Sequence, residues 1–372
     1  MHRNRQQGFT IVEMLVAIAI ILIMMTAAMM IYQRSVQVSG VVTSRAEIQS
    51  ELRAAADQIA RDLNQAGTGI PIGGLPIPSA AAGGANPQFG CDVNTCYLQP
   101  GQYALSNGVL YKIVPANGVG PNTTEPTDAI VITYLEPLAV DPNDPNASGT
   151  APNWSTYPTQ VIADDGSSLT MPAGTTPKIN DPAYGLVIGD ILMLQNSSGS
   201  ALGVVTNFDG SSNVITFSAL DPLNLNQPTA PTGNIAALKF NPVPTSGPKY
   251  PPTTVSRMMM ITYFIQQVPT TYGTDYRLMR QVDARTPTPV AEHIEDLQFT
   301  YDVFDDSSST VTSNLPDAAT GTPPTPKPNQ IRKVNITITA RSSRPNAQGV
   351  YDRQTVTTSI GPRNLSFHDR YN

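Results

Sequence analysis

Gly8-Phe9-Thr10-Ile11-Val12-Glu13-Met14-Leu15 begins an apolar stretch that continues to Ile31. The residues before Phe9 include Arg3 and Arg5 and no acid, a pattern typical of the cytoplasmic flank of a membrane segment. Residues 9–31 would form about 35 Å of helix at about 1.5 Å per residue, enough to cross a hydrocarbon core of about 30 Å. The stretch therefore predicts one membrane-spanning helix near the N-terminus.

A cleaved secretory signal is the alternative interpretation of this stretch. Such a signal has a shorter apolar region, which ends at a cleavage site made of small residues. Ala27 and Ala28 resemble a site of this kind, but the apolar run continues beyond them through Met29, Met30 and Ile31. The longer run favours a helix that spans the bilayer.

Glu13 is the one acidic residue in the apolar run. An unpaired charge at the centre of a bilayer costs about 2.5–3.5 kcal/mol on insertion scales, so an acid inside a membrane segment is a candidate functional residue. The alternative is that Glu13 lies close to the lipid headgroups and is solvated there.

The stretch and its basic leader resemble the N-terminal class III signal of type IV prepilins and type II secretion pseudopilins. The resemblance rests on Gly8, Phe9, the acid at position 13 and the positive charge of the leader. It implies that prepilin peptidase cuts after Gly8 and methylates the new N-terminal residue, Phe9. For Glu13 it implies a role in assembly, as partner of the free N-terminal amine of a neighbouring subunit. A buried acid is tolerated when a cation neutralises it.

The residues after the apolar run predict a continuation of the same helix, to about residue 65. Charged residues separate apolar ones that recur mostly every three or four positions, namely Val42, Ile48, Leu52, Ala55 or Ala56, Ile59 and Leu63. Gly67 and Gly69 are expected to end the helix, and Gly40 is the expected position of a bend. We expect this amphipathic part, residues 32–66, to pack on the chain's own β-sheet; a coiled-coil stalk is the alternative.

Composition predicts that the rest of the chain is a β-rich head. The protein has 372 residues, of which 40% are hydrophobic and 13% charged, and it contains 34 Pro and 27 Gly. Proline and glycine break helices and are common in turns. The net charge of −6 argues against a nucleic-acid partner, which would require clustered Lys and Arg. We therefore expect an α+β protein: a leader (1–8), a membrane helix (9–31), an amphipathic helix (32–66) and an antiparallel β head (67–372).

Within the head, irregular loops are expected at 67–90, 137–182 and 305–330, and an additional β module at about 184–240. Asp209-Gly210 predicts a hairpin turn between the runs 201–206 and 213–217, and residues 269–274 predict another between 258–267 and 276–282. The predicted strands cover residues 108–114, 128–135, 189–194, 201–206, 213–217, 258–267, 276–282, 294–302 and 331–338.

The order of these elements is similar to that of PilW-type minor pilins, with GspJ-type pseudopilins as relatives. The similarity rests on the long helix, the strand-like runs at 127–134, 189–194, 276–280 and 294–301, and Arg-Asn-Leu at 363–365. It implies a minor pilin that takes part in the initiation or assembly of a type IV pilus, or alternatively a minor pseudopilin of a type II secretion system. The implied partners are prepilin peptidase, other major and minor pilins and the bacterial inner membrane, with the head in the periplasm and then at the cell surface.

Cys91 and Cys96 are the only cysteines. Their close spacing favours a disulfide in an oxidising compartment. Free thiols remain an alternative. A zinc site is a further alternative, although it would need distant ligands because the only histidines are His2, His293 and His368.

The sequence contains no recognisable catalytic motif, such as Gly-x-Ser-x-Gly, a Walker loop or His-Glu-x-x-His. We therefore expect no enzymatic activity, cofactor or metal, with a membrane-anchored hydrolase as the alternative.

Two further features have alternative interpretations. The oxygen-rich segments 141–146 and 302–306 could bind calcium, although the interpretation as solvated loops is favoured. Trp154, Tyr157 and Tyr184 either present an adhesive surface at a filament tip or cover the sheet.

Overall fold

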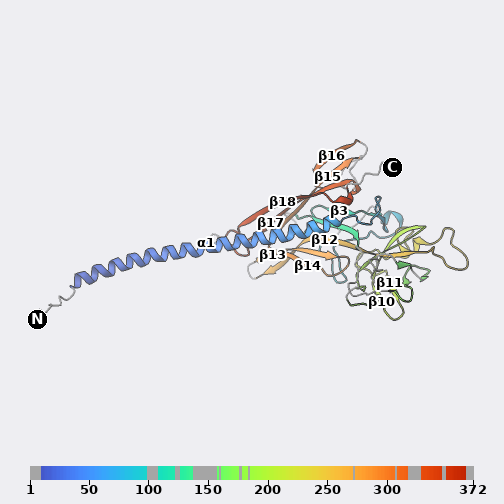
Figure 1. Cartoon of the computed structure of the whole chain (residues 1–372), viewed down its shortest axis with the longest axis horizontal. Helices are drawn as coiled ribbons and strands as arrows, with labels where there is room; N and C mark the ends of the chain where they lie inside the picture. Colours follow the sequence, from blue (N-terminus) through green and yellow to red (C-terminus); the bar gives the residue numbers. More distant parts are fainter. Residues whose placement is uncertain are drawn as a thin grey trace, which may run out of the picture.

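The computed structural model describes residues 10–98, 108–121, 126–136, 157–158, 161–175, 178–182, 185–270, 273–305, 308–316, 328–345 and 349–365. One long helix projects from a β-rich head, and the N-terminus lies at the far end of that helix (Figure 1). The α+β architecture expected from the sequence is confirmed.

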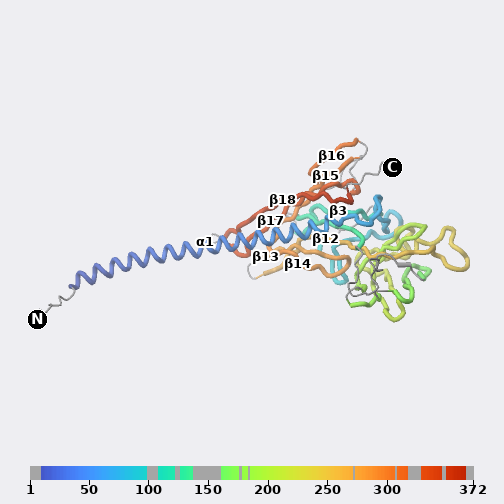
Figure 2. Tube along the Cα trace, viewed as in Figure 1, coloured from blue at the N-terminus to red at the C-terminus, as the bar shows by residue number. Residues whose placement is uncertain are grey.

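Helix α1 spans Ile11–Gln65 and is continuous over its 55 residues. It passes through Gly40 without interruption, so the bend expected there does not break the helix (Figure 2). An isolated glycine costs only about 1 kcal/mol in a helix interior, which good helix formers on both sides can offset. The helix ends where expected, because Gly67 and Gly69 adopt φ values of 77° and 71°, in the left-handed region that glycine favours.

The largest sheet of the described residues has eight strands, all paired antiparallel, with β12 at its centre. One part of β12 pairs with β5 and β8, and another part pairs with β4 and β13. We call it the central sheet. Its strands are β3 (Ile113–Ala116), β4 (Ala129–Leu135), β5 (Tyr157–Pro158), β8 (Ile191–Asn196), β9 (Gly199–Val204), β12 (Thr254–Thr270), β13 (Gly273–Val282) and β14 (Thr288–Glu292).

A second antiparallel sheet has four strands in the order β16-β15-β17-β18, and we call it the C-terminal sheet. His293 alone separates β14 of the central sheet from β15 of this one. The strands are β15 (Ile294–Asp305), β16 (Thr310–Leu315), β17 (Ile331–Arg341) and β18 (Arg353–Ile360).

The distal end of the head, opposite the N-terminus of α1, carries a smaller module with its own apolar core (Figure 1). This core draws residues from Ile162 to Val255. The sheet of the module has the strand order β10-β11-β7-β6. These strands are β10 (Asn207–Asp209), β11 (Val214–Thr216), β7 (Ser168–Thr170) and β6 (Val161–Ile162).

The remaining elements are short. A two-stranded sheet joins β1 (Leu75–Pro76) to β2 (Val109–Leu110). Short 3₁₀ turns occupy Ala80–Ala82 (η1), Ile235–Leu238 (η2), Pro328–Gln330 (η3) and Arg363–Leu365 (η4).

The C-terminal part of α1 packs into the main core, between side chains of the two larger sheets. Its buried apolar residues follow helical spacing and are Ile48, Leu52, Ala55, Ile59 and Leu63. They meet Tyr263 and Ile265 of β12 and Phe299 of β15 in one cluster. Packing on the chain's own sheets is thus confirmed from Ile48 onward. Val42, which the periodicity had placed on the same stripe, is exposed, although its neighbours Val41 and Thr43 line a hollow together with Arg344 of the head.

Several expectations for the strands need correction. The turn at Asp209-Gly210 exists, but it joins β10 to β11, and β9 pairs with β8 instead. The run 108–114 divides into β2 and β3, which belong to different sheets. Strands β14, β16 and β18 were not predicted, and β16 lies in a stretch expected to be a loop. Of the loop expected at 137–182, residues 161–171 include β6 and β7, and much of the remainder lies outside the described residues.

Candidate assembly helix

The N-terminal half of α1 exposes its apolar side chains on all sides. Ile11 is 82% exposed and Ile31 is 70% exposed, and the residues between them are exposed as well. By length and composition this helix could cross a membrane. No other part of the described chain covers this apolar half. An apolar surface of this size is not stable in water, so this segment requires lipid or the apolar segments of other proteins around it.

Thr10 and Glu13 form a capping box at the start of α1. The Thr10 backbone N–H donates to Oε2 of Glu13 at 2.9 Å, and the Thr10 hydroxyl donates to the same oxygen at 3.0 Å. In return, the Glu13 backbone N–H donates to Oγ1 of Thr10 at 3.3 Å. These contacts satisfy backbone donors that a helix start leaves free. They also direct the Glu13 carboxylate back toward the N-terminal end of the helix. The spacing Thr-x-x-Glu is a signature of this motif that the sequence analysis did not use.

Gly8 and Phe9, the predicted cleavage and methylation positions, lie outside the described residues. The described residues begin immediately after them, at Thr10, which is the N-cap of α1. Cleavage after Gly8, methylation of Phe9 and pairing of Glu13 with a neighbouring amine therefore stay predictions.

A buried ion pair fixes the other half of α1 to the central sheet. Asp62 is only 4% exposed. Its carboxylate accepts from Nε of Arg280 at 2.7 Å, from Nη2 of Arg280 at 3.2 Å and from the hydroxyl of Tyr263 at 2.5 Å. In the sequence, Asp62 is one of the charged residues that separate the apolar positions of this segment. Tertiary packing alone brings it to Arg280, which is 218 residues away along the chain.

The electrostatics of this site agree with a charged pair. Burial alone would lower the pKa of Arg280, but the hydrogen bond and negative charge of Asp62 outweigh that effect and raise it. Burial, together with the charge of Asp62, also raises the pKa of the Tyr263 phenol. Arg280 and Tyr263 therefore both keep their protons over the physiological range. The site can hold the helix in one register on the sheet.

The C-terminal end of α1 is held by the last described turn of the chain, η4. The Thr68 hydroxyl donates to the Gln65 carbonyl at 2.7 Å, and Nδ2 of Asn364 donates to the Thr68 hydroxyl at 2.8 Å. Nζ of Lys112 donates to the Asn364 carbonyl at 3.1 Å, and Leu365 is buried in the main core. The Arg-Asn-Leu run at 363–365 thus contacts the end of the helix.

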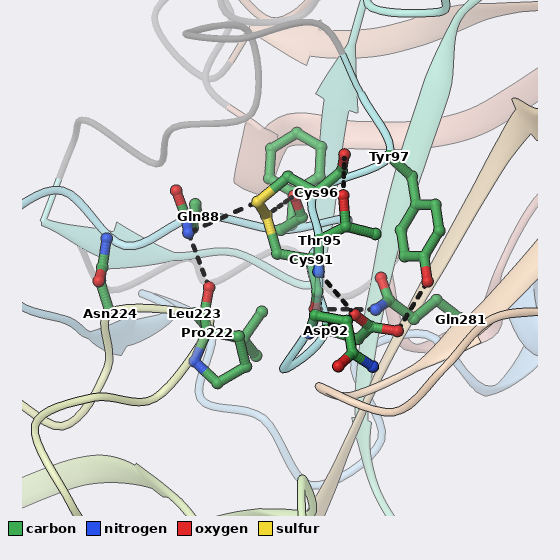
Figure 3. The surroundings of a disulfide bond; sticks show 12 residues. Gln88, Cys91, Asp92, Thr95, Cys96, Tyr97, Pro222, Leu223, Asn224 and Gln281 are labelled. Atoms are coloured by element: carbon green, nitrogen blue, oxygen red, sulfur yellow. Dashed lines mark hydrogen bonds between the residues drawn. A yellow bond between two sulfur atoms is a disulfide. The ribbon is translucent and has the colours of Figure 1, made fainter.

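Cys91 and Cys96 form a disulfide, as the preferred interpretation predicted (Figure 3). Within the small loop that it closes, Oδ1 of Asp92 accepts from the backbone N–H groups of Asn94 and Thr95 at 2.8 and 3.0 Å. Nε2 of Gln281, on β13, donates to the Cys91 carbonyl at 2.8 Å. The free-thiol and zinc alternatives are therefore wrong, and the loop is attached to the central sheet.

The other polar candidates have structural partners or lie outside the described residues. Nδ1 of His293 lies 2.8 Å from Oδ1 of Asp275, and Oδ1 of Asp302 accepts from the Asn314 backbone and from Asn335 at 3.0 Å each. Among the described residues no cluster of His, Cys, Asp and Glu could hold a metal ion. The undescribed candidates are His2, His368, residues 141–146, Asp306, Trp154 and Tyr184, together with the side chain of Tyr157.

Comparison with known protein families adds one finding. Residues 3–29 match the family model described as the prokaryotic N-terminal methylation motif. The chain has the N-terminus of a type IV prepilin-like protein. The matched range contains Gly8, Phe9, Glu13 and most of the exposed apolar half of α1, so it supports processing by prepilin peptidase and is compatible with single-pass anchoring in a membrane. No curated protein and no solved structure matches the chain.

Proposed function

We propose that this prepilin-like protein is a minor pilin that takes part in the initiation or assembly of a type IV pilus, most similar to the PilW type. The observation that supports this best is the division of α1. Its first half is apolar and exposed, and it continues without interruption into a second half that is fixed in a large head. Such a helix can leave the bilayer for the core of a filament, because both environments cover the same apolar surface.

Glu13 has a defined task in this proposal. After cleavage, the amine of Phe9 in one subunit would neutralise Glu13 of its neighbour. The contacts of Thr10 support this, because they direct the Glu13 carboxylate toward the end of the helix where a neighbouring amine would approach. A charged pair in an apolar environment requires both partners, so removal of either one is costly. Pairing would therefore favour subunits that are correctly aligned along the filament.

The protein would act by packing and binding, and we propose that it is not an enzyme. The head, residues 67–372, is larger than a typical domain of about 100–150 residues. A subunit with so large a head is difficult to repeat throughout a closely packed shaft. We therefore propose that it occurs in low copy number or at the filament tip.

The distal module supports an additional role as a binding module at the tip. It has its own core and lies at the end of the head farthest from the N-terminus (Figure 1). Leu220 in this region is 92% exposed, and Phe240 and Val243 also expose apolar surface. Recognition sites are often found on such loops, carried by a rigid scaffold.

Mass spectrometry of the mature protein tests the proposal directly. The expected N-terminal residue is Phe9 carrying an N-methyl group, and replacement of Gly8 should leave the leader attached. A mature chain that begins elsewhere or lacks the methyl group would contradict the proposal.

The role of Glu13 requires a separate experiment. Glu13→Ala should be cleaved largely as the wild type is, but sheared filaments should contain much less of it. Wild-type levels of the variant in filaments would remove the proposed role. Glu13→Asp is the matched control, since it keeps the charge.

Loss of the gene distinguishes the two prepilin-like systems. A minor pilin of a pilus predicts fewer surface filaments with normal protein secretion. The alternative, a minor pseudopilin of a type II secretion system, predicts the reverse. The neighbouring genes provide a second, independent indication of the system.

A further inference from the structure

Strands β8 and β13 lie one after the other along the same edge of β12. Strand β4 pairs with Met258–Tyr263 of β12, a range that overlaps Thr254–Met258, which pair with β8, and Ile261–Thr270, which pair with β13. A strand has only two edges, so β8 and β13 share the edge opposite β4. Among the described residues, Met259 and Met260 have no strand partner on that shared edge. The sheet therefore has a gap between β8 and β13.

Asp283, the first residue after β13, closes this gap. Its backbone N–H donates to the Met260 carbonyl at 2.8 Å, and its side-chain Oδ1 accepts from the Met260 backbone N–H at 2.7 Å. The backbone N–H of Ile191, at the start of β8, points toward the same carboxyl. The next residue, Ala284, donates its backbone N–H to the Gly189 carbonyl at 3.0 Å, just before β8. Asp283 and Ala284 thus join the end of β13 to the start of β8.

The charges around Asp283 are balanced without it. Asp283 and Asp190 are both completely buried. The Asp190 carboxylate pairs with Arg285 and lies 3.3 Å from Nη2 of Arg257. Arg257 also pairs with Glu136 at 3.1 Å. Two carboxylates and two guanidinium groups therefore neutralise one another, and an ionised Asp283 would add a buried negative charge without a counter-ion.

The other ionisable groups on the elements packed nearby supply no positive charge either. Tyr134 of β4 faces Asp283, and burial raises the pKa of its phenol to about 12. The disulfide loop carries Asp92, whose carboxylate accepts from the Tyr97 hydroxyl at 2.6 Å. In the part of the chain that the structure describes, the positive groups at this joint are thus the two guanidinium groups that already pair with Asp190.

The second carboxyl oxygen of Asp283 also favours the neutral form. Oδ2 is buried and accepts no hydrogen bond from the described residues. An ionised carboxylate oxygen is a strong acceptor, and it is costly to bury without a donor. Burial and the negative charge of Asp190 raise the pKa of Asp283 well above its usual range, although the hydrogen bond from Met260 acts in the opposite direction.

We propose that Asp283 keeps its proton in the folded head, and that this neutral carboxyl holds the start of β8 to the end of β13. Strand β8 also supplies Leu192 and Leu194 to the core of the distal module. The joint therefore attaches the distal module to the rest of the central sheet, and it weakens as the pH rises and the proton is lost. This property of the head is independent of the proposed function.

The proton gives the stability of the head a pH dependence of known direction. In the unfolded chain, an aspartate loses its proton near about pH 3.9. The folded head keeps the proton to a higher pH, so folding takes up one proton between these two values. Over that range the equilibrium constant for unfolding rises about tenfold per pH unit. The contribution of the protonated carboxyl is complete below about pH 3.9, and it is lost as the pH rises through the folded value.

Asp283→Asn in the full-length protein tests the proposal. Asparagine has the same shape, is neutral at every pH, and is common in the left-handed conformation of this residue, whose φ is 53°. Denaturant unfolding in detergent micelles, followed by circular dichroism, is measured between about pH 5 and about pH 8. We expect the unfolding constant of the wild type, divided by that of the variant, to rise about tenfold per pH unit. Asp57→Asn, exposed on α1, is the matched control, and its ratio should not change with pH.

Infrared spectroscopy provides a measurement that a merely structural role would not affect. At neutral pH the folded wild type should show the carbonyl stretch of a protonated carboxylic acid. Asp57→Asn should keep this band, and Asp283→Asn should lose it. Asp283→Ser should lose it as well, so the assignment does not depend on one substitution.

Two results would overturn the inference. One is a ratio of unfolding constants for Asp283→Asn that stays constant with pH, as it does for the control. The other is a folded wild type without the band of a protonated acid. Neither measurement involves cleavage after Gly8 or incorporation into filaments, so failure here is distinguishable from failure of the proposed pilin function.

Discussion

The two halves of α1 form one continuous helix but differ in what surrounds them. From Ile11 to Ile31 the apolar residues occur on every face, and all of them are exposed. From Ile48 to Leu63 they form one stripe, and that stripe is buried in the head. The comparison shows that both halves form helix, whereas the distribution of apolar residues around the helix determines what covers each half. An apolar surface on all sides requires an external partner, and a stripe can be covered by the chain itself.

The ion pair of Asp62 gives the largest expected effect on the docked half. Asp62→Ala leaves the partly buried Arg280 and the buried Tyr263 hydroxyl without their partner, so the free energy of unfolding should fall by up to about 3–5 kcal/mol. Denaturant unfolding of the detergent-solubilised protein, followed by circular dichroism, measures this change. The matched control is Asp57→Ala on the exposed face of the same helix, which should change stability by less than about 0.5 kcal/mol. Equal effects of the two variants would contradict the assigned role.

A pair of identical substitutions compares the two halves directly. Leu52 is fully buried, and Leu52→Ala should lower the free energy of unfolding of the head by about 2–5 kcal/mol because it leaves a cavity. Leu22 is exposed, and Leu22→Ala should leave that free energy within about 0.5 kcal/mol of the wild type. The same denaturant titration serves both variants. If Leu22→Ala destabilised the head as much as Leu52→Ala does, the two halves would not be energetically separate.

The smallest expected effect concerns the start of the free half. Thr10→Ala removes the capping hydroxyl and should destabilise the first turn of α1 by about 1 kcal/mol. Hydrogen exchange in micelles should become faster at the backbone amides of residues 12–14, while the unfolding of the head stays unchanged. Thr26→Ala is the control, because its hydroxyl donates to the Leu22 carbonyl within the helix and caps no end. Unchanged exchange in Thr10→Ala would show that the capping box does not hold the helix start.

The predictions from sequence were most accurate where a single local pattern decides the structure. The helix end at Gly67, the strand that became β4 and the Cys91–Cys96 pair all depend on neighbouring residues, and each was confirmed. Errors occurred where pairing over long range decides. Strand β16 is short and exposed and lies in a stretch expected to be a loop, and it exists because β15 pairs with it. The predicted pairing of residues 201–206 with residues 213–217 was wrong for the same reason, since β9 pairs with β8.

The sequence by itself determined that the chain begins with a helix long and apolar enough to cross a membrane, that this helix continues as an amphipathic one, and that a β-rich head follows. Composition and periodicity are sufficient for this, because they describe which surfaces avoid water. Only the tertiary structure decided where the head begins to cover the helix, that Asp62 meets Arg280 and Tyr263, and which strands lie at the edges of each sheet. Those features depend on residues far apart in the chain, and no local pattern records their proximity.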